Sequence, residues 1–230
     1  MKDIVRRRRP EPEALDLNIV FEDDAIIALD KPPGMVVHPT YRNWSGTLLN
    51  GVLWHLRNRP GLTPHIVTRL DKDTSGLVLM ALTPALHARV QKDAAAGRVK
   101  KEYVAIVRGT PDPPNGTIDL PLARSLEDRR RVVVSPTGQM SKTRYELLQS
   151  GGNNCSLVCC ELITGRTHQI RVHMAARGWP ILGDQVYGTS DGWPGRQALH
   201  AWRVALPHPV TREHLELESP LPAEFQNFRL

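Results

Sequence analysis

Short apolar runs separated by turn residues dominate this chain of 230 residues. Runs of about four to eight residues are typical of strands, whereas amphipathic helices show apolar residues three and four positions apart over longer stretches. Most of the runs therefore predict strands, and the unbroken apolar run at residues 77–82 is typical of a strand buried on both faces. The other predicted strands lie at residues 18–22, 25–29, 101–108, 142–148 and 156–163, with final strands around Leu215 and Leu217.

Three segments predict helices because they combine helical spacing with residues that start or stop helices. A hydroxyl side chain stands at the start of each, and a glycine follows the second and the third. The segments are residues 48–56 behind Ser45 or Thr47, the stretch from Pro84 to Gly97 behind Thr83, and the stretch from Thr164 to Gly178.

Strands outnumber helices in this pattern, and short turns join most of them. The pattern predicts an α+β fold with a largely antiparallel β-sheet and a few flanking helices. Residues 18–230 are expected to form one domain. Residues 1–17 contain the basic run 6–9 and few apolar residues, so we predict a disordered basic N-terminal tail, with an RNA-contacting arm as the alternative.

Composition narrows the choice of partner and compartment. The net charge of +6 favours a polyanion such as nucleic acid as a partner.

The three cysteines, Cys155, Cys159 and Cys160, share one predicted strand. In a strand, positions four apart are about 13 Å from each other, and neighbours point to opposite faces. We therefore predict reduced thiols in a cytoplasmic protein. No apolar run approaches the about 20 residues of a membrane-spanning helix.

The densest charge beside an apolar run lies at residues 69–76, directly before the strand at 77–82. Charges next to a buried strand are unfavourable unless they are paired or used. Arg69 and Lys72 flank Asp71, and nearby cations favour the ionised carboxylate. Such a carboxylate can be a general base, a nucleophile or one half of a structural ion pair, and the residues alone leave these roles open.

Common cofactor and metal motifs are missing from the sequence. It contains no dinucleotide-binding glycine pattern, no phosphate-loop lysine motif and no serine-hydrolase elbow. His168 and His173 stand five positions apart, whereas a helical zinc pair stands four apart. We expect no metal site, and we predict that both histidines make local hydrogen bonds.

Four segments, taken together, resemble the RluA-type pseudouridine synthases. The resemblance extends over residues 18–225, and its last segment is the most specific. It implies a single catalytic domain over residues 18–230, built on a largely antiparallel mixed sheet with a central active-site cleft. The segments are residues 30–34 with His38 and Pro39; residues 69–76; residues 101–103 with Val107 and Gly109; and residues 164–173, continued by residues 180–184, Tyr187 and Gly188.

The resemblance implies an enzyme that detaches uracil from ribose in RNA, turns it and rejoins it through carbon. Asp71 matches the catalytic aspartate, which attacks either the ribose anomeric carbon or the uracil ring. Tyr103 matches the tyrosine that packs against the target uracil and moves a ribose proton. Arg166 matches the arginine that pairs with the aspartate. Because the reaction is an isomerisation without redox change, no cofactor is expected.

RNA binding is expected from Arg69, Lys101 and Arg171. Arg69 matches the arginine that faces the space left in the RNA by the extruded target base. Extruding a uridine costs a few kcal/mol of stacking. Aromatic stacking and a guanidinium in the gap offset that cost. The implied partner is ribosomal or transfer RNA, and a monomer without membrane or metal partners is expected.

The chain departs from the family pattern at one position. Family members commonly have histidine where this chain has Thr68, for which we expect a smaller hydrogen-bonding role.

The sequence leaves two alternative functions open. The first alternative is an RNA-binding or ribosome-assembly protein that keeps the fold without catalysis. The second is an enzyme that releases the base without rejoining it. Glycoside hydrolases generally use two carboxylates, and Asp73 is the nearest candidate in sequence.

Overall fold

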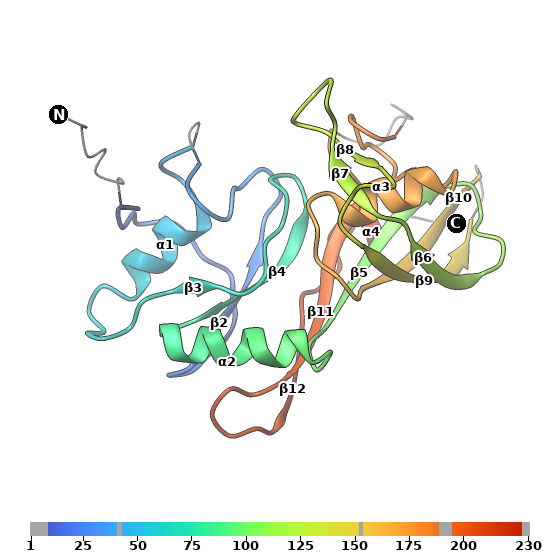
Figure 1. Ribbon diagram of the computed structural model, residues 1–230. Helices are drawn as coiled ribbons and strands as arrows, with labels where there is room; N and C mark the ends of the chain where they lie inside the picture. The colour runs from blue at the N-terminus through green and yellow to red at the C-terminus, as the bar shows by residue number, and fades with distance from the viewer. Residues whose placement is uncertain (1–8, 41–42, 152–153, 189–194, 227–230) are drawn as a thin grey trace.

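The computed structural model describes residues 9–40, 43–151, 154–188 and 195–226. One ten-stranded sheet carries the order β1-β2-β4-β11-β5-β10-β9-β6, with β3 also on β4 and β12 also on β11 (Figure 1). A separate hairpin, β7–β8, projects beside helix α3. The strands are β1 Ile19–Glu22, β2 Ile26–Lys31, β3 His65–Ile66, β4 Ser75–Ala81, β5 Lys100–Arg108, β6 Asn115–Asp119, β7 Leu122–Arg124, β8 Val132–Val134, β9 Lys142–Ser150, β10 Cys155–Leu162, β11 Leu199–Pro207 and β12 His214–Glu218.

The sheet is mixed but mostly antiparallel, which confirms the predicted α+β class. Its parallel pair is β4 with β11, and this pair is only two residues long, Ser75 with His200 and Gly76 with Ala201. Gly76 has φ of +108°, and a Cβ there would lie 2.2 Å from the Ala201 carbonyl oxygen. The β4–β11 pair joins two halves of the sheet: the first half holds β1–β4, and the second holds β5, β6 and β9–β12. Glycine is therefore required where these halves meet.

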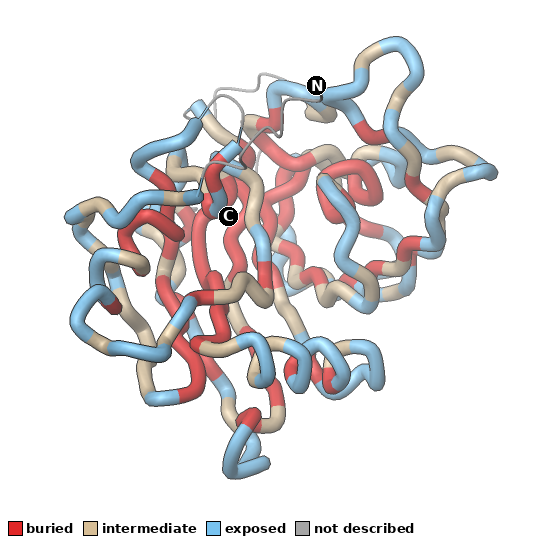
Figure 2. Tube along the Cα trace, turned by 60° about the vertical axis from the view of Figure 1, so that its left-hand side comes forward, coloured by how far each residue is buried: buried red, intermediate tan, exposed pale blue. Residues whose placement is uncertain are grey.

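Strand β4 lies at the centre of the first half and is buried along its whole length; Figure 2 shows the buried residues concentrated on the central strands. On one face Leu77 and Leu79 share a core with Val90 of α2. On the other face Val78 and Met80 share a core with Val52 of α1. The unbroken apolar run thus has the burial on both faces that was predicted. The helices are α1 Leu48–His55, α2 Pro84–Ala95, α3 Gln169–Ala176 and α4 Ala223–Gln226.

Two predicted helix starts are confirmed and one is wrong. Thr47 caps α1 and Thr83 caps α2 through their side-chain oxygens. The third helix begins at Gln169, five residues later than Thr164. The Thr164 hydroxyl accepts from the Lys142 backbone N–H at 2.8 Å, and His168 has φ of +55°, so the stretch before Gln169 is a turn.

Residues 1–8 of the predicted N-terminal tail lie outside the described part of the chain, and residues 9–17 lie inside it. Residues 11–17 make contacts with the first helix. The Glu13 backbone N–H donates to the Asn50 carbonyl at 3.0 Å, and Asn50 Nδ2 donates to the Glu11 carbonyl at 2.7 Å. Leu17 packs so close to Gly51 that a Cβ there would be 2.8 Å from it. Residues 11–17 therefore form part of the packing around α1.

The three cysteines are free thiols, as predicted. Burial, followed by the charge of Glu102, raises the pKa of Cys159 to about 12, so this thiol stays protonated at neutral pH. In the described ranges we find no helix with the length and apolar character needed to cross a membrane.

Candidate active site

A cleft of about 400 Å³ lies where the two halves of the sheet meet. Residues 36–40 and the segment before β4 line it from the first half. Strand β5, the end of β10 and the turn before α3 line it from the second half. The cleft is therefore built by segments far apart in the sequence, and Asp71 lies between them.

The loop that carries Asp71 is fixed to the second half of the sheet. Gln197 Nε2 donates to the Thr74 hydroxyl at 3.1 Å. The Ser75 hydroxyl lies 2.9 Å from His200 Nδ1, and Arg196 donates to the Asp73 carbonyl at 3.3 Å. These contacts hold the loop while the Asp71 side chain, 28% exposed, still faces the cleft.

Arg171 on α3 holds the Asp71 carboxylate. Its Nη1 donates to Asp71 Oδ2 at 2.9 Å. Its Nε and Nη2 donate to the two carboxylate oxygens of Asp184 at 2.7 and 2.8 Å, a bidentate pair. Arg171 is 7% exposed and Asp184 is fully buried. One guanidinium thus connects the partly exposed carboxylate of Asp71 to the buried one of Asp184.

The electrostatics favour the charged forms of Arg171 and Asp184. Burial opposes ionisation of Arg171, but the hydrogen bond and charge of Asp184, with the charge of Asp71, outweigh it and raise the pKa of Arg171. Burial likewise opposes ionisation of Asp184, but the Arg171 hydrogen bond and charge outweigh it and lower the pKa of Asp184. The Asp184 carboxylate also accepts the backbone N–H groups of Val186 and Tyr187. Its acceptor capacity is used, which stabilises the buried charge.

Arg166 does not make the predicted ion pair with Asp71. It is exposed, and its backbone N–H donates to the Gln169 side chain at 3.0 Å. Because α3 starts at Gln169, Arg171 lies on the first turn of the helix and faces the Asp71 loop, while Arg166 lies in the turn before it. The pairing role belongs to Arg171. Arg171 was predicted to contact RNA; in the structure its buried guanidinium donates to two carboxylates, those of Asp71 and Asp184.

Tyr103 on β5 lines the same cleft as Asp71 and is 7% exposed. Burial, followed by the Asp71 charge, raises the pKa of this phenol above its ordinary value. The side chain is neutral at neutral pH, so it offers a ring face and a hydroxyl donor beside the carboxylate. Asp71 and Tyr103 are brought together as predicted.

Comparisons with known proteins show which family the chain belongs to. Residues 25–176, more than half of the chain, match the model of the family described as RNA pseudouridylate synthase. The chain belongs to this family. It is an RNA pseudouridine synthase, an isomerase, and the family's fold is the mixed sheet described above.

Individual relatives cover nearly all of the synthase. It is 41% identical to the uncharacterized RNA pseudouridine synthase YlyB of Bacillus subtilis, over 94% of this chain and 75% of that protein. It is 41% identical to ribosomal large subunit pseudouridine synthase D of Pasteurella multocida, over 94% of this chain and 71% of that protein. Among solved structures, human RNA pseudouridylate synthase domain containing 1 superposes with a TM-score of 0.75 at 26% identity, covering 91% of this chain and 85% of that one.

Arg69 and Lys101 line the cleft of the synthase from opposite sides. Arg69 is exposed, in the loop before Asp71. Lys101 on β5 is partly buried, and this desolvation lowers its pKa. Thr68 has the small hydrogen-bonding role expected of it, because its hydroxyl accepts the Leu79 backbone N–H at 2.8 Å.

Sequence reasoning missed four residues that position the site. Asp184 and Tyr187 belong to the matched segments, but their partners lie elsewhere in the chain. His168 and Lys31 were likewise not assigned to the site. A charged or polar side chain next to apolar residues was the available signal, since such a group needs a partner when it is buried.

His168 and Tyr187 connect Asp71 to the β7–β8 hairpin. His168 Nε2 lies 3.8 Å from Asp71 Oδ2, and its Nδ1 lies 2.8 Å from the Tyr187 hydroxyl. That hydroxyl accepts the Val132 backbone N–H of β8 at 2.8 Å. Burial, only partly opposed by the Asp71 charge, lowers the pKa of His168, so the ring is neutral at neutral pH. His168 thus makes a hydrogen bond, but its partner Tyr187 lies 19 positions along the chain, so this is not the local contact that was predicted.

Tyr187→Phe is expected to loosen the hairpin. It removes the acceptor of the Val132 N–H, and an unpaired buried group costs about 1–3 kcal/mol. We expect faster amide hydrogen exchange in β8 and weaker RNA binding. Tyr145→Phe is the matched control, because its hydroxyl donates to the Pro113 carbonyl away from the hairpin. Equal exchange in β8 for both variants would contradict the connection.

Lys31 is a fully buried lysine that ties two loops together. Its Nζ donates to the carbonyl oxygens of Pro32 at 2.7 Å, Met35 at 2.9 Å and Lys72 at 2.9 Å. Lys72 follows Asp71 directly. Burial, partly opposed by the Asp73 charge, lowers the pKa of Lys31 to about 8. The ammonium group therefore uses its three donors to hold the backbone on either side of the cleft.

Lys31→Met is expected to destabilise the fold and to lower the turnover of the synthase. The variant leaves three carbonyl groups without their donor, for which we expect a loss on the order of 2–4 kcal/mol in the free energy of unfolding. Denaturant unfolding measures it. Lys100→Met, at the exposed start of β5, is the control and should change stability by less than about 0.5 kcal/mol. Equal stability of the two variants would refute the role of Lys31.

Proposed function

We propose that this synthase isomerises uridine in the RNA of the large ribosomal subunit, in the cytoplasm, as a monomer and without a cofactor. Support for the RNA comes from the relative named as ribosomal large subunit pseudouridine synthase D, which is 41% identical over 94% of the chain. The net charge of +6 agrees with an RNA substrate. Transfer RNA is the comparison substrate.

We assign the chemistry to Asp71. Its carboxylate attacks either the ribose anomeric carbon or the uracil ring, the bond from N1 to the ribose breaks, and the bond from C5 to the ribose forms. The proton leaves C5, and N1 gains one. Arg171 holds one carboxylate oxygen at 2.9 Å, which aims the other oxygen at the substrate. Tyr103 packs on the flipped uracil and presents its hydroxyl to the ribose.

The single observation that carries this assignment is the composition of the cleft. Of the described residues that line it, Asp71 alone bears a carboxylate. Asp73 is not among the lining residues, so a two-carboxylate hydrolysis that releases the base is disfavoured. An RNA-binding protein without catalysis has no use for a partly exposed carboxylate held by a buried arginine, and this disfavours the other alternative.

We propose that Arg69, Arg166 and Lys101 contact the RNA around the flipped uridine. Arg69 and Arg166 are exposed at the cleft, and none of the carboxylates in the described ranges pairs with either of them. A guanidinium can pair with phosphates or stack in the gap that the uridine leaves.

The purified chain tests the proposal against transcripts of large-subunit ribosomal RNA and, in parallel, transfer RNA. We expect pseudouridine at one or a few uridines of the ribosomal transcript and none in transfer RNA. Pseudouridine in transfer RNA alone would overturn the choice of substrate. Free uracil with abasic sites would overturn the isomerisation.

A further inference from the structure

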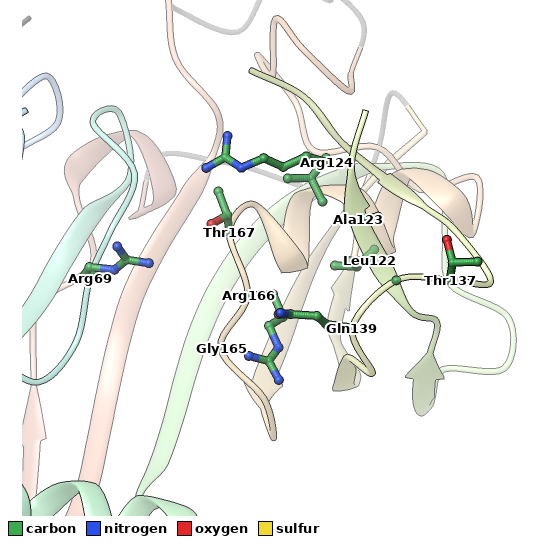
Figure 3. Close-up of a pocket in the computed structure, with 11 residues that line it drawn as sticks. Arg69, Leu122, Ala123, Arg124, Thr137, Gln139, Gly165, Arg166 and Thr167 are labelled. Carbon is green, nitrogen blue, oxygen red and sulfur yellow. The ribbon is translucent and has the colours of Figure 1, made fainter. Parts of the chain in front are cut away.

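A second cavity of about 360 Å³ adjoins the catalytic cleft of the synthase (Figure 3). The hairpin β7–β8 and residues 137–139 form one wall, and the turn at residues 165–167 forms the other. Arg69, Arg124 and the same turn also line the catalytic cleft. The two spaces are therefore neighbours that share one rim, and neither Asp71 nor Tyr103 lines the second.

The charged side chains that line this cavity in the described part of the chain are all positive. Three arginines line it, Arg69, Arg124 and Arg166, and none of its described lining residues is acidic. The Arg124 guanidinium donates to the Arg129 carbonyl, a neutral partner, at 2.8 Å. Three like charges around one space repel one another unless an anion joins them. RNA phosphates on either side of the flipped uridine are the anions that the reaction supplies.

Gln139 supplies the cavity with a group that can distinguish bases. Its backbone is fixed by two hydrogen bonds with Leu122, at 2.8 and 2.9 Å. A Cβ on the preceding Gly138 would lie 2.5 Å from the Leu122 backbone, so this approach is close. The Gln139 side chain is exposed and extends toward Arg166 in the cavity (Figure 3). In the described ranges no residue hydrogen-bonds its amide, which offers a donor and an acceptor in one plane.

We propose that this cavity binds the nucleotide next to the target uridine along the RNA, with the arginines on its phosphates and the Gln139 amide on its base edge. The inference rests on the proposed function and adds to it a determinant of sequence context. Leu122 and Val132, both among the residues that line the cavity, are apolar and suit contact with a base. The volume lies within the range of about 300–1,000 Å³ found for ligand pockets.

The test uses the full chain and a ribosomal RNA segment in which it forms pseudouridine, remade with the nucleotides on both sides of that uridine randomised. Sequencing of the modified pool gives the relative kcat/KM for each neighbouring base. For the unaltered chain we expect a preference for one base at one flanking position. Gln139→Leu should weaken that preference by at least about fivefold, because a planar amide contact is what distinguishes base edges.

Two further variants test whether the preference depends on the Gln139 amide itself. Gln149→Leu makes the same change at an exposed position of β9, away from the cavity, and should keep the preference. Gln139→Glu keeps the size but only accepts hydrogen bonds, so the preference should move toward bases with an amino group. An unaltered preference in both Gln139 variants, or an equal loss of rate for all four bases, would overturn the subsite. If the unaltered chain modifies no ribosomal RNA, the proposed function itself fails, and the inference fails with it.

Discussion

Asp71→Asn is expected to abolish pseudouridine formation while RNA binding survives. The amide keeps the size of the side chain and can still accept a hydrogen bond from Arg171, but it is not a nucleophile. Loss of an enzyme's nucleophile lowers turnover by a factor on the order of 10⁴ or more. Single-turnover assays with purified RNA and filter binding in parallel measure the two properties separately.

Asp73→Asn is the matched control, two residues further along the same loop. Its side chain does not line the cleft, so turnover should stay within about twofold of the original chain. If Asp71→Asn retained activity, the assignment of the nucleophile would be wrong. If both variants were inactive, a mechanism with two carboxylates would regain support.

Arg171→Met is expected to destabilise the synthase and also to reduce its turnover. The substitution leaves the fully buried Asp184 without its partner, and removing one member of a buried ion pair costs about 3–5 kcal/mol. Asp71 loses the contact that orients it. Arg166→Met is the control, because this arginine is exposed. Its free energy of unfolding should change by less than about 0.5 kcal/mol, while RNA binding weakens.

The pH dependence separates the two arginine variants further. The folded-state pKa of Asp184 lies below its ordinary value, so its contribution is present above the unfolded pKa and is lost as the pH falls through the folded one. In Arg171→Met the cation that lowers the pKa of Asp184 is gone, so protonating this buried carboxyl no longer costs stability. The deficit in unfolding free energy of Arg171→Met relative to Arg166→Met should therefore shrink as the pH falls through the range in which Asp184 takes up its proton. Denaturant unfolding at a series of pH values measures this, and a deficit that is the same at every pH would contradict the pairing of Arg171 with Asp184.

Local signals in the sequence predicted most of the elements, because apolar runs and caps act over a few residues. Thr47 and Thr83 cap helices as expected, and the run before Thr83 is buried on both faces. The third helix was the exception. Thr164 could cap a helix, but its hydroxyl accepts from Lys142, which lies 22 positions earlier, and a sequence window does not contain that competitor.

The site was harder to predict, since its contacts join distant segments. Asp71 and Arg171 are 100 positions apart, and the choice between Arg166 and Arg171 depends on which residue begins α3. The family resemblance supplied the aspartate and the tyrosine. The buried partners Asp184 and Lys31 follow only from three-dimensional packing, because their roles are set by the carboxylate, guanidinium and carbonyl groups that surround them.

The central claim is that Asp71 of this chain forms pseudouridine in large-subunit ribosomal RNA. The most direct measurement maps pseudouridines across total RNA from cells that lack the gene and carry either the original chain or Asp71→Asn. We predict that the same ribosomal positions disappear in the deleted cells, return with the original chain and stay absent with Asp71→Asn. An unchanged map in the deleted cells, or its restoration by Asp71→Asn, would contradict the claim.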